Sequence, residues 1–433
     1  MSPNHQSQQP LSVILPTALL AGGISGLSVI VFQRLTQLEL LSYLAQLEGQ
    51  FNSIYLLLPL IAIAIMIPLR KRYHMYSRVG LPSLSSAFHF GSGIIPMGNL
   101  IYQFTFASLA IISGFAVGAV GPALFIGAAV ASQLGQKFKF KPPTLRLLCG
   151  CGAAGAMAAL FNTPFAAVFL VTELIIRRWH WQTQLAMLIS AFTAAGLTQL
   201  SGTQAFTLNT SSIDINANFL LHITLAGIAC GLIAIILNHS IAFISSRPKY
   251  TTPLAWFIAA IITSIAGFYN IDALGLGEGL INQLFYKEPD INTQIDWLLI
   301  RILLTVVAIG VAIPGGMLGP ALVLGALVGA LQGLWLPPEQ QEMMILVSMA
   351  AMLGAVLGAP LAGALLICEI TQHPDYIIPT LIACFAASLS LKLLKQQSLH
   401  NMLLSRAQIN LENSPLLQNN KNHYGKKWFN WFK

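Results

Sequence analysis

The chain has 433 residues, of which 55% are hydrophobic and 8% are charged. Because roughly a quarter of the residues in an ordinary soluble domain are charged, this composition excludes a soluble globular protein and predicts an all-α, polytopic membrane protein. The formal net charge of +8 is expected to come from basic loops that face anionic lipid, and we expect no nucleic-acid partner.

The chain begins with a polar tail at residues 1–10, which lacks the features of a signal peptide, so we expect a cytoplasmic N-terminus. Apolar runs then recur, several of them close to the roughly 20 residues that a spanning helix needs. The clearest runs cover residues 56–69, 220–237, 254–268, 298–313 and 376–391. Other runs are shorter and broken by Gly or Pro, where lipid cannot satisfy the backbone. The sequence therefore predicts many tilted and half-spanning helices.

Basic residues cluster at three places, residues 70–78, 177–178 and 247–249. Loops rich in Lys and Arg face the cytoplasm in most membrane proteins, so we expect these three loops on that side. A fourth basic stretch, at residues 137–141, fits this orientation less well.

One eleven-residue phrase occurs twice in the chain. Residues 121–131 read GPALFIGAAVA and residues 319–329 read GPALVLGALVG, with seven matches in eleven positions. Downstream, FNTPFAAVFLVTE, which ends at Glu173, is matched by LGAPLAGALLICE, which ends at Glu369. An apolar chain of two repeats is typical of a transporter or channel whose permeant site lies between the repeats near the middle of the bilayer. The repeat therefore predicts an ion or solute pathway.

The repeat also divides the chain. We predict a first transmembrane repeat at residues 11–200, a polar connector at 201–215 and a second transmembrane repeat at 216–400. Residues 401–433 form a polar, basic C-terminal tail that is too short for a regulatory domain. Its end, rich in Lys, Trp and Phe, is expected either to lie on a membrane surface or to be disordered.

The sequence offers no constellation for metal, cofactor or catalytic chemistry. Cys149 and Cys151 lie close together, but no third ligand stands near them at metal-binding spacing. We interpret the phrase CGCG at residues 149–152 as small residues that let helices approach closely. A Ser/His/Asp arrangement and a phosphate-binding loop are also missing. We therefore predict no metal, no cofactor and no enzymatic activity.

Three glycine-rich phrases carry the candidate chemistry. They read GSGIIP at residues 91–96, GAVGP at 118–122 and GGMLGP at 315–320. Each precedes an apolar segment that is expected to be helical, with Pro where a first turn tolerates it. A helix start exposes unpaired N–H groups and about half a positive charge, so converging starts form an anion site. The alternative, that the glycines are only bends or close-packing points, stays open for any single phrase.

At these phrases the chain resembles the CLC family of chloride channels and proton/chloride antiporters, in its bacterial form without C-terminal regulatory domains. The family has the phrases G-S-G-I-P, G-(K/R)-E-G-P and G-x-F-x-P in this order. The three phrases of this chain stand in the same order, and the resemblance covers about residues 11–405. It implies an inverted-topology repeat, a homodimer with one anion pathway per subunit, and chloride or other small anions as substrates. It also implies contact with membrane lipid, a bacterial cytoplasmic membrane location and cytoplasmic termini.

The resemblance assigns a central chloride site to six residues. They are Ser92, Gly93, Ile94, Met317, Leu318 and His400. Ser92 matches a serine that contacts the central anion, and His400 stands where most members have a tyrosine whose hydroxyl completes the site. A histidine can also donate a hydrogen bond. The alternative for His400 is an interfacial histidine without this role.

The resemblance assigns the gate phrase to Gly118, Val120, Gly121 and Pro122. Val120 stands where the family's gating and proton-carrying glutamate is expected, and a valine cannot accept a proton. Leu174 stands where the family's exchangers have a second, inner glutamate. The resemblance therefore implies that both proton-carrying carboxylates are missing.

Of the 14 acidic residues, only Glu173 and Glu369 lie deep in apolar helical stretches. Intramembrane carboxylates are functional candidates, since burying them is costly. Arg177 follows Glu173 by one helical turn, a spacing that permits an ion pair. Because the two glutamates occupy equivalent repeat positions, we interpret them as structural; a proton relay is the alternative.

These observations favour a passive chloride pathway without proton coupling. One alternative is a proton/chloride exchanger in which Glu173 or His400 carries the proton. Another is a membrane protein that has kept the fold but acts as a non-conducting binding or regulatory partner.

Overall fold

The computed structural model describes residues 11–36, 52–73, 80–202, 217–247, 252–287, 289–414 and 416. These residues form helices and connecting loops, and none of them belongs to a strand. The predicted tail at residues 1–10, most of the predicted connector at 201–215 and the predicted C-terminal tail beyond residue 416 lie outside the described ranges.

Two successive sets of helices follow the predicted repeats. The first set is α1 (Leu11–Thr36), α3 (Asn52–Arg72), α4 (Leu81–His89), α5 (Met97–Ile112), α6 (Val120–Lys137), α7 (Pro142–Phe161), α8 (Pro164–Val171), the π-helical turn η2 (Thr172–Ile176) and α9 (Trp181–Leu200). The second set is α10 (Ala217–Ser245), α11 (Pro253–Tyr269), η4 (Ile271–Ala273), α12 (Glu278–Tyr286), α13 (Ile291–Gly310), α14 (Leu318–Gly333), α15 (Pro338–Leu357), α16 (Pro360–Thr371), η5 (Pro374–Tyr376) and α17 (Ile377–Leu393). Two short helices follow, α18 (Leu399–Arg406) and η6 (Leu411–Asn413).

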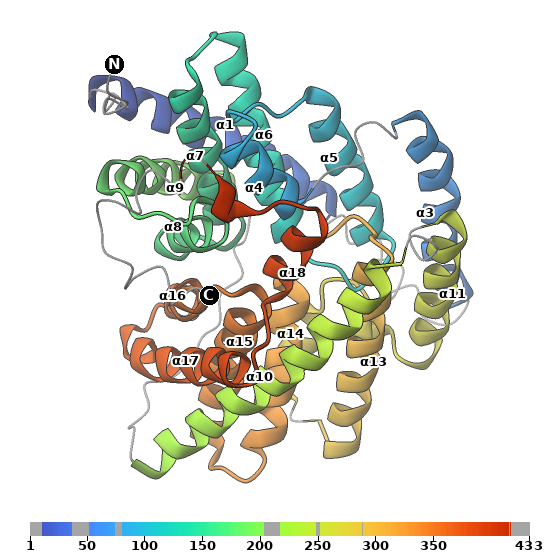
Figure 1. The fold of residues 1–433 in the computed structure, drawn as a ribbon. Helices are drawn as coiled ribbons and strands as arrows, with labels where there is room; N and C mark the ends of the chain where they lie inside the picture. Colours follow the sequence, from blue (N-terminus) through green and yellow to red (C-terminus); the bar gives the residue numbers. More distant parts are fainter. Residues whose placement is uncertain are drawn as a thin grey trace.

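Equivalent helices of the two sets make equivalent contacts. In the first set α6 packs against α7 and α1 against α9; in the second, α14 packs against α15 and α10 against α17. The sets meet where α8 contacts α16 and where α3 contacts α11, at opposite sides of Figure 1. The repeat that the sequence predicts is therefore a repeat of the fold.

Six of the described helices are long and apolar enough to cross a membrane. They are α1, α7, α10, α13, α15 and α17. Shorter apolar segments lie between them. The stretch Pro164–Ile176, shared by α8 and η2, is about 20 Å long at 1.5 Å per residue, whereas the hydrocarbon core of a bilayer is about 30 Å thick. The prediction of half-spanning helices is confirmed.

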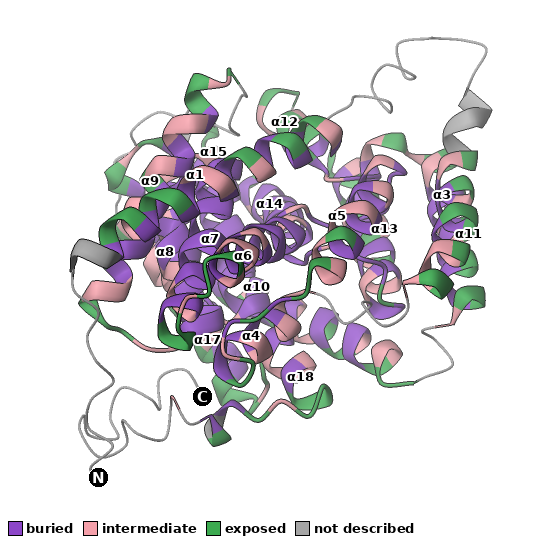
Figure 2. Cartoon of the chain, turned by 90° about the horizontal axis from the view of Figure 1, so that it is seen from above, coloured by how far each residue is buried: buried purple, intermediate pink, exposed green. Residues whose placement is uncertain are grey.

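The central helices α6, α7, α14 and α15 are mostly buried, as the purple ribbon of Figure 2 shows. Glycine lets them approach to backbone contact. A Cβ on Gly152 of α7 would lie 2.3 Å from the carbonyl oxygen of Gly127 on α6, and a Cβ on Gly329 of α14 would lie 2.4 Å from that of Met344 on α15. This geometry supports the interpretation of the CGCG phrase, which ends at Gly152, as a close-packing point.

We expect Gly152→Val to disrupt folding, because its side chain would collide with the Gly127 carbonyl of α6. Overpacking of this kind costs about 1–3 kcal/mol, or more where backbone must move. Gly196→Val in α9 is the matched control, since nothing lies within 4 Å of its Cβ position. Size-exclusion profiles and melting temperatures of the two purified variants test this; equal melting temperatures would contradict the close contact.

Candidate functional site

The second and third glycine phrases meet at the boundary between the two helix sets. Gly118 donates its N–H to the carbonyl oxygen of Gly316 at 2.7 Å, and Gly316 donates its N–H to the carbonyl oxygen of Gly118 at 2.7 Å. These two bonds form an isolated antiparallel bridge. Because α6 and α14 each begin two residues later, both helix starts lie beside the bridge, as the sequence predicts.

Glycine is required at the bridge because the two backbones touch. A Cβ on Gly118 would lie 2.8 Å from the amide nitrogen of Gly319, and a Cβ on Gly316 would lie 2.6 Å from the amide nitrogen of Gly121. Such contacts cannot form without a shift of the backbone. Any side chain here would therefore separate the two helix starts.

The amide hydrogens at these helix starts are buried and unpaired. Val120 is 2% exposed, Leu318 is 3% and Met317 is 6%. Within the described ranges, no backbone acceptor takes the N–H of any of the three. The first N–H groups of a helix lack intrahelical partners and carry about half a positive charge. A small anion is therefore the ligand that this pair of starts suits best.

Val120 contributes only hydrocarbon to the first turn of α6, and Pro122 follows it in that turn. The valine side chain packs in the same buried cluster as Met317 and Leu318. It cannot bind a proton or carry a negative charge. An anion at these helix starts would therefore meet no competing carboxylate from this position.

The first glycine phrase, at residues 91–96, directly precedes α5, as the sequence predicts, and Pro96 is the N-cap of that helix. The chloride-site role of Ser92, Gly93 and Ile94 stays a prediction. The phrase is the loop that leaves the C-terminus of α4, and α5 begins only after it. Gly93 donates its N–H to the carbonyl oxygen of Ala87 at 2.8 Å, and Ile94 donates to that of Gly91 at 3.0 Å. Ser92 itself is a half-buried turn residue with φ 57°.

Helix α4 also begins after a glycine. Helix α4 follows Gly80, which has φ 94°, and Pro82 stands in its first turn. The second set repeats this arrangement at α12, which follows Gly277 with φ 83°. Helix α4 packs against α6, η2 and α18, and Figure 2 shows it beside α18. Gly80 lies 197 residues before Gly277, close to the repeat offset, so the two helix starts belong to the same repeat.

His400 lies in the first turn of α18 and is 2% exposed. Its Nε2 donates to the carbonyl oxygen of Leu174 at 3.1 Å. Burial, together with the nearby Arg177 guanidinium, lowers the pKa of His400 to about 3, so the ring is neutral at physiological pH. A neutral imidazole has one N–H, and the carbonyl oxygen of Leu174 accepts its hydrogen bond. In this arrangement His400 has no N–H left for an anion.

His89 of α4 holds the neighbouring carbonyl of the same π-helical turn. Its Nε2 lies 2.7 Å from the carbonyl oxygen of Ile175, and its Nδ1 lies 3.0 Å from Oγ of Ser414. Burial lowers the pKa of His89 to about 4. Two neutral histidines, from α4 and α18, therefore fix consecutive carbonyls of η2.

We expect these histidines to make stability fall in acid. Because both pKa values lie below the ordinary value of about 6.5, the neutral rings stabilise the folded protein above pH 6.5. This contribution is lost as the pH falls from 6.5 towards 4, by about 1.4 kcal/mol per pH unit for each ring. Melting temperatures between pH 7.5 and 4.5 should therefore fall less steeply in His400→Gln than in the parent. Parallel curves would contradict the buried, neutral state of His400.

Glu173 closes a helix start in the opposite set. Its Oε1 accepts the N–H of Leu361 at 3.2 Å, and its Oε2 accepts the N–H of Ala362 at 2.9 Å. Both donors lie in the first turn of α16. The carboxylate therefore satisfies two of the N–H groups that the helix itself leaves unpaired.

Glu369 makes the reciprocal contact. Its Oε1 accepts the N–H of Phe165 at 2.9 Å, and its Oε2 accepts the N–H of Ala166 at 2.7 Å, in the first turn of α8. The equivalence that the sequence repeat predicts is thus a pair of matching contacts between the two sets. Each half-spanning helix is capped by a carboxylate from the other repeat.

The predicted ion pair between Glu173 and Arg177 is wrong. Arg177 donates from Nη2 to Oδ1 of Asn401, while both Glu173 oxygens face α16. Glu173 lies in the π-helical turn η2, and Arg177 ends that turn with φ 55°. The residue four positions after Glu173 is therefore no longer on the same helix face.

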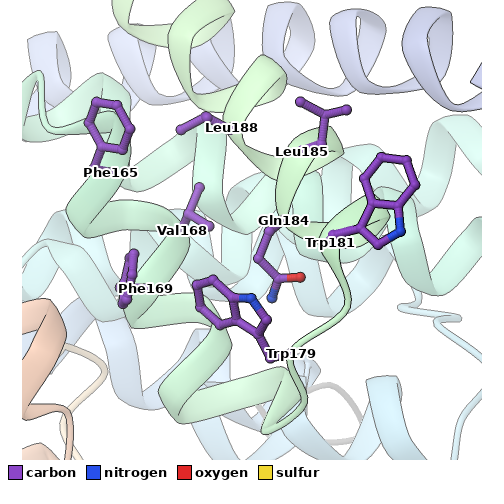
Figure 3. A pocket seen from close by; sticks show the side chains of 8 residues that line it. All are labelled: Phe165, Val168, Phe169, Trp179, Trp181, Gln184, Leu185 and Leu188. Carbon is purple, nitrogen blue, oxygen red and sulfur yellow. The ribbon is translucent and has the colours of Figure 1, made fainter.

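An apolar groove lies on α8 and α9. None of the described residues that line it is charged. Its cavity volume is about 390 Å³, and its lining consists of Phe165, Val168, Phe169, Trp179, Trp181, Gln184, Leu185 and Leu188. Figure 3 shows the two tryptophans at one end, with Gln184 between them and the aliphatic side chains. Nε2 of Gln184 donates a hydrogen bond to Oγ1 of Thr172 at 3.2 Å. The groove therefore suits hydrocarbon rather than an ion.

Comparison with known proteins gives a family match for most of both helix sets. Residues 60–392 match the family model described as voltage gated chloride channel. The match contains all three glycine phrases and both capping glutamates, and it ends before His400.

Curated relatives of this chain carry the name voltage-gated ClC-type chloride channel ClcB. The protein of Salmonella typhimurium (strain LT2) is 25% identical over 323 residues, which cover 71% of this chain and 76% of that protein. The protein of Escherichia coli O9:H4 (strain HS) is 27% identical over 306 residues, which cover 67% and 72%.

Solved structures share the fold. A slow cyanobacterial Cl⁻/H⁺ antiporter has a TM-score of 0.82 and 22% identity, over 94% of this chain and 99% of that one. A CLC-type fluoride/proton antiporter has a TM-score of 0.78 and 24% identity, over 92% and 99%. At this level of identity the likeness shows the fold alone.

Proposed function

Because the chain belongs to the voltage-gated chloride channel family, we propose that it carries chloride passively, without proton coupling, through a pathway between its two repeats. Members of this family are anion transporters rather than enzymes. The observation that carries the proposal is the start of α6, where buried, unpaired amides stand beside Val120 instead of a carboxylate. The site attracts an anion and has no proton acceptor at this position.

We place the central anion against the N–H groups of Met317 and Leu318, at the start of α14. The start of α6, with Gly118, Gly121 and Pro122, borders it across the bridge, and we keep the loop of Ser92, Gly93 and Ile94 as the proposed third element, with the Ser92 hydroxyl as donor. Helix starts recognise an anion by dipole and N–H groups alone. Chloride, a small monovalent anion, needs no full counter-charge at such a site.

The absence of coupling rests on the carboxylates. Leu174 of η2 is 1% exposed and apolar, so its side chain cannot bind a proton. Both oxygens of Glu173 already accept N–H groups of α16, and protonation would remove one of these acceptors. Along the described part of the pathway, the residues favour anion passage alone.

Simultaneous measurement of chloride efflux and proton uptake in liposomes tests the proposal. Vesicles are loaded with chloride, and valinomycin with potassium balances the charge. We expect chloride efflux without uphill proton movement. Coupled proton uptake that is lost in Glu173→Gln or His400→Phe would instead establish an exchanger with a substitute carrier. Saturable chloride binding without any flux would identify a non-conducting binding protein.

We further propose that the protein functions as a homodimer, with one pathway in each copy. The groove of Figure 3 and the exposed Phe192 give α9 an apolar outer face, and Phe385 and Leu389 extend such a face on α17. An isologous interface needs one self-complementary patch, and these helices surround the α8–α16 contact. Cross-linking in dilute detergent solution should trap dimers. Recovery of monomers alone would contradict the dimer and indicate that lipid covers this face.

A further inference from the structure

Three arginines gather at the end of the molecule that carries α4 and α18. The arginine cluster consists of Arg146 in α7 and of Arg177 and Arg178, which follow η2. All three guanidinium groups act electrostatically on the ring of His89. The backbone nitrogen of Arg146 would lie 2.8 Å from a Cβ on Gly93, so the loop at residues 91–96 borders the cluster. Elements distant in sequence therefore bring three cations to one place.

Four donor nitrogens of the arginine cluster are buried and unpaired among the described residues. Nε of each of the three arginines, and Nη2 of Arg178, are buried without a hydrogen-bond acceptor among the described residues. The bond from Arg177 to Asn401 leaves that guanidinium with further donors. Buried donors without partners are rare in folded proteins, and each such group points to a water or an ion that satisfies it.

The groups that face the arginine cluster do not neutralise it. His89 and His400 are neutral rings whose N–H groups are taken by carbonyls of η2. Glu173, the acidic residue on η2, turns both oxygens to α16. Burial lowers the pKa of Arg177 to about 10, which still leaves it charged at neutral pH. The described surroundings therefore hold three positive charges and no paired carboxylate.

The cluster is also reachable from outside. Arg146, Arg177 and Arg178 are partly exposed, and Trp179, next to Arg178, is 58% exposed. The basic loops at residues 70–72 and 177–178 are expected on the cytoplasmic side. A ligand from the cytoplasm or from the inner lipid leaflet can therefore approach it.

We propose that the arginine cluster binds a phosphate group at the mouth of the pathway bordered by α4 and α18. Guanidinium groups present planar forks of N–H donors that match the oxygens of phosphate in pairs, which a spherical chloride ion cannot use. The group has two sources, free phosphate and the headgroup of an anionic lipid. A bound phosphate places negative charge beside the entrance and lowers the local chloride concentration, so it slows chloride flux from that side.

Equilibrium dialysis of the purified full chain against radiolabelled inorganic phosphate, at constant ionic strength, tests the site. We expect saturable binding that weakens about tenfold or more in Arg146→Gln and in Arg178→Gln, because each removes charge-assisted hydrogen bonds. Arg178→Lys, which keeps the charge but loses the fork, should lie between the parent and Arg178→Gln. Arg406→Gln is the matched control: Arg406 lies on α18 but bonds to Ser245 Oγ, and its loss should leave binding unchanged.

Nanodiscs of phosphatidylcholine, with and without phosphatidylglycerol, distinguish the two sources. Displacement of the labelled phosphate by phosphatidylglycerol would identify the lipid headgroup as the occupant, and undiminished binding would identify free phosphate. The proposal is overturned if no saturable binding occurs, or if the monodisperse Arg178→Lys and Arg178→Gln variants bind as the parent does. Because binding is measured without transport, a failure of the uncoupled chloride pathway would leave this result intact.

Discussion

Val120→Glu is expected to suppress chloride flux about tenfold or more at pH 7.5 and to restore it in acid. A carboxylate at the start of α6 would accept the unpaired N–H groups there and occupy the place of the anion. The ionised form competes with chloride, whereas the protonated form does not. Chloride flux should therefore recover as the pH falls towards the ordinary pKa of glutamate, about 4.3. Chloride efflux from liposomes at symmetrical pH values between 7.5 and 4 measures the effect.

Val120→Gln is the control for this prediction, since it has nearly the size of glutamate and does not ionise. We expect its flux to be lower or higher than that of the parent by a factor that does not change with pH. A flux of Val120→Glu that follows the parent at every pH would show that Val120 does not border the pathway.

The internal repeat made the main features of the fold predictable. Two copies of one phrase at a fixed offset predicted matching helices, and the bridge between Gly118 and Gly316 is the contact that such symmetry produces. The same offset predicted the equivalence of Glu173 and Glu369. What the offset could not show is that each glutamate points across the boundary, because a partner in the other repeat has no signature in local spacing.

The first glycine phrase is only partly predictable from its letters. Its letters predict a helix start, and α5 does begin directly after it, with Pro96 as the N-cap. The letters do not show that the N–H groups of Gly93 and Ile94 are bonded within the loop that leaves α4. Gly80, before Leu81 and Pro82, begins α4. Its repeat partner Gly277 is followed by Glu278, which hid the equivalence at the level of letters.

The ion pair predicted from Glu173 to Arg177 failed because it assumed an unbroken α-helix. A π-helical turn adds one residue per hydrogen-bonded loop, and η2 holds Glu173 within such a turn. The register shift turns the carboxylate to α16 and leaves Leu174 and Ile175 with carbonyls that His400 and His89 then bind. Sequence spacing alone carries no signal for this shift.

Glu173→Gln is expected to lower the melting temperature of the protein by several degrees, while chloride flux stays uncoupled from protons as in the parent. The amide keeps one oxygen for Leu361 or Ala362 and turns an NH₂ group towards the other donor. The variant loses a charged acceptor, and one buried backbone N–H then faces another donor. Together these changes should lower the free energy of unfolding by about 3 kcal/mol. Thermal unfolding followed by size exclusion, together with the paired chloride and proton flux assay, measures both quantities.

Glu369→Gln separates a structural role of Glu173 from a proton relay. Its carboxylate makes the same two bonds to the opposite repeat, so the structural role predicts similar losses of melting temperature in the two variants and no change of coupling in either. A relay has no such symmetry, because only Glu173 adjoins Leu174, which meets His400. A change of proton stoichiometry in Glu173→Gln alone would therefore assign the proton to Glu173, and equal destabilisation without that change would assign both glutamates to holding the two repeats together.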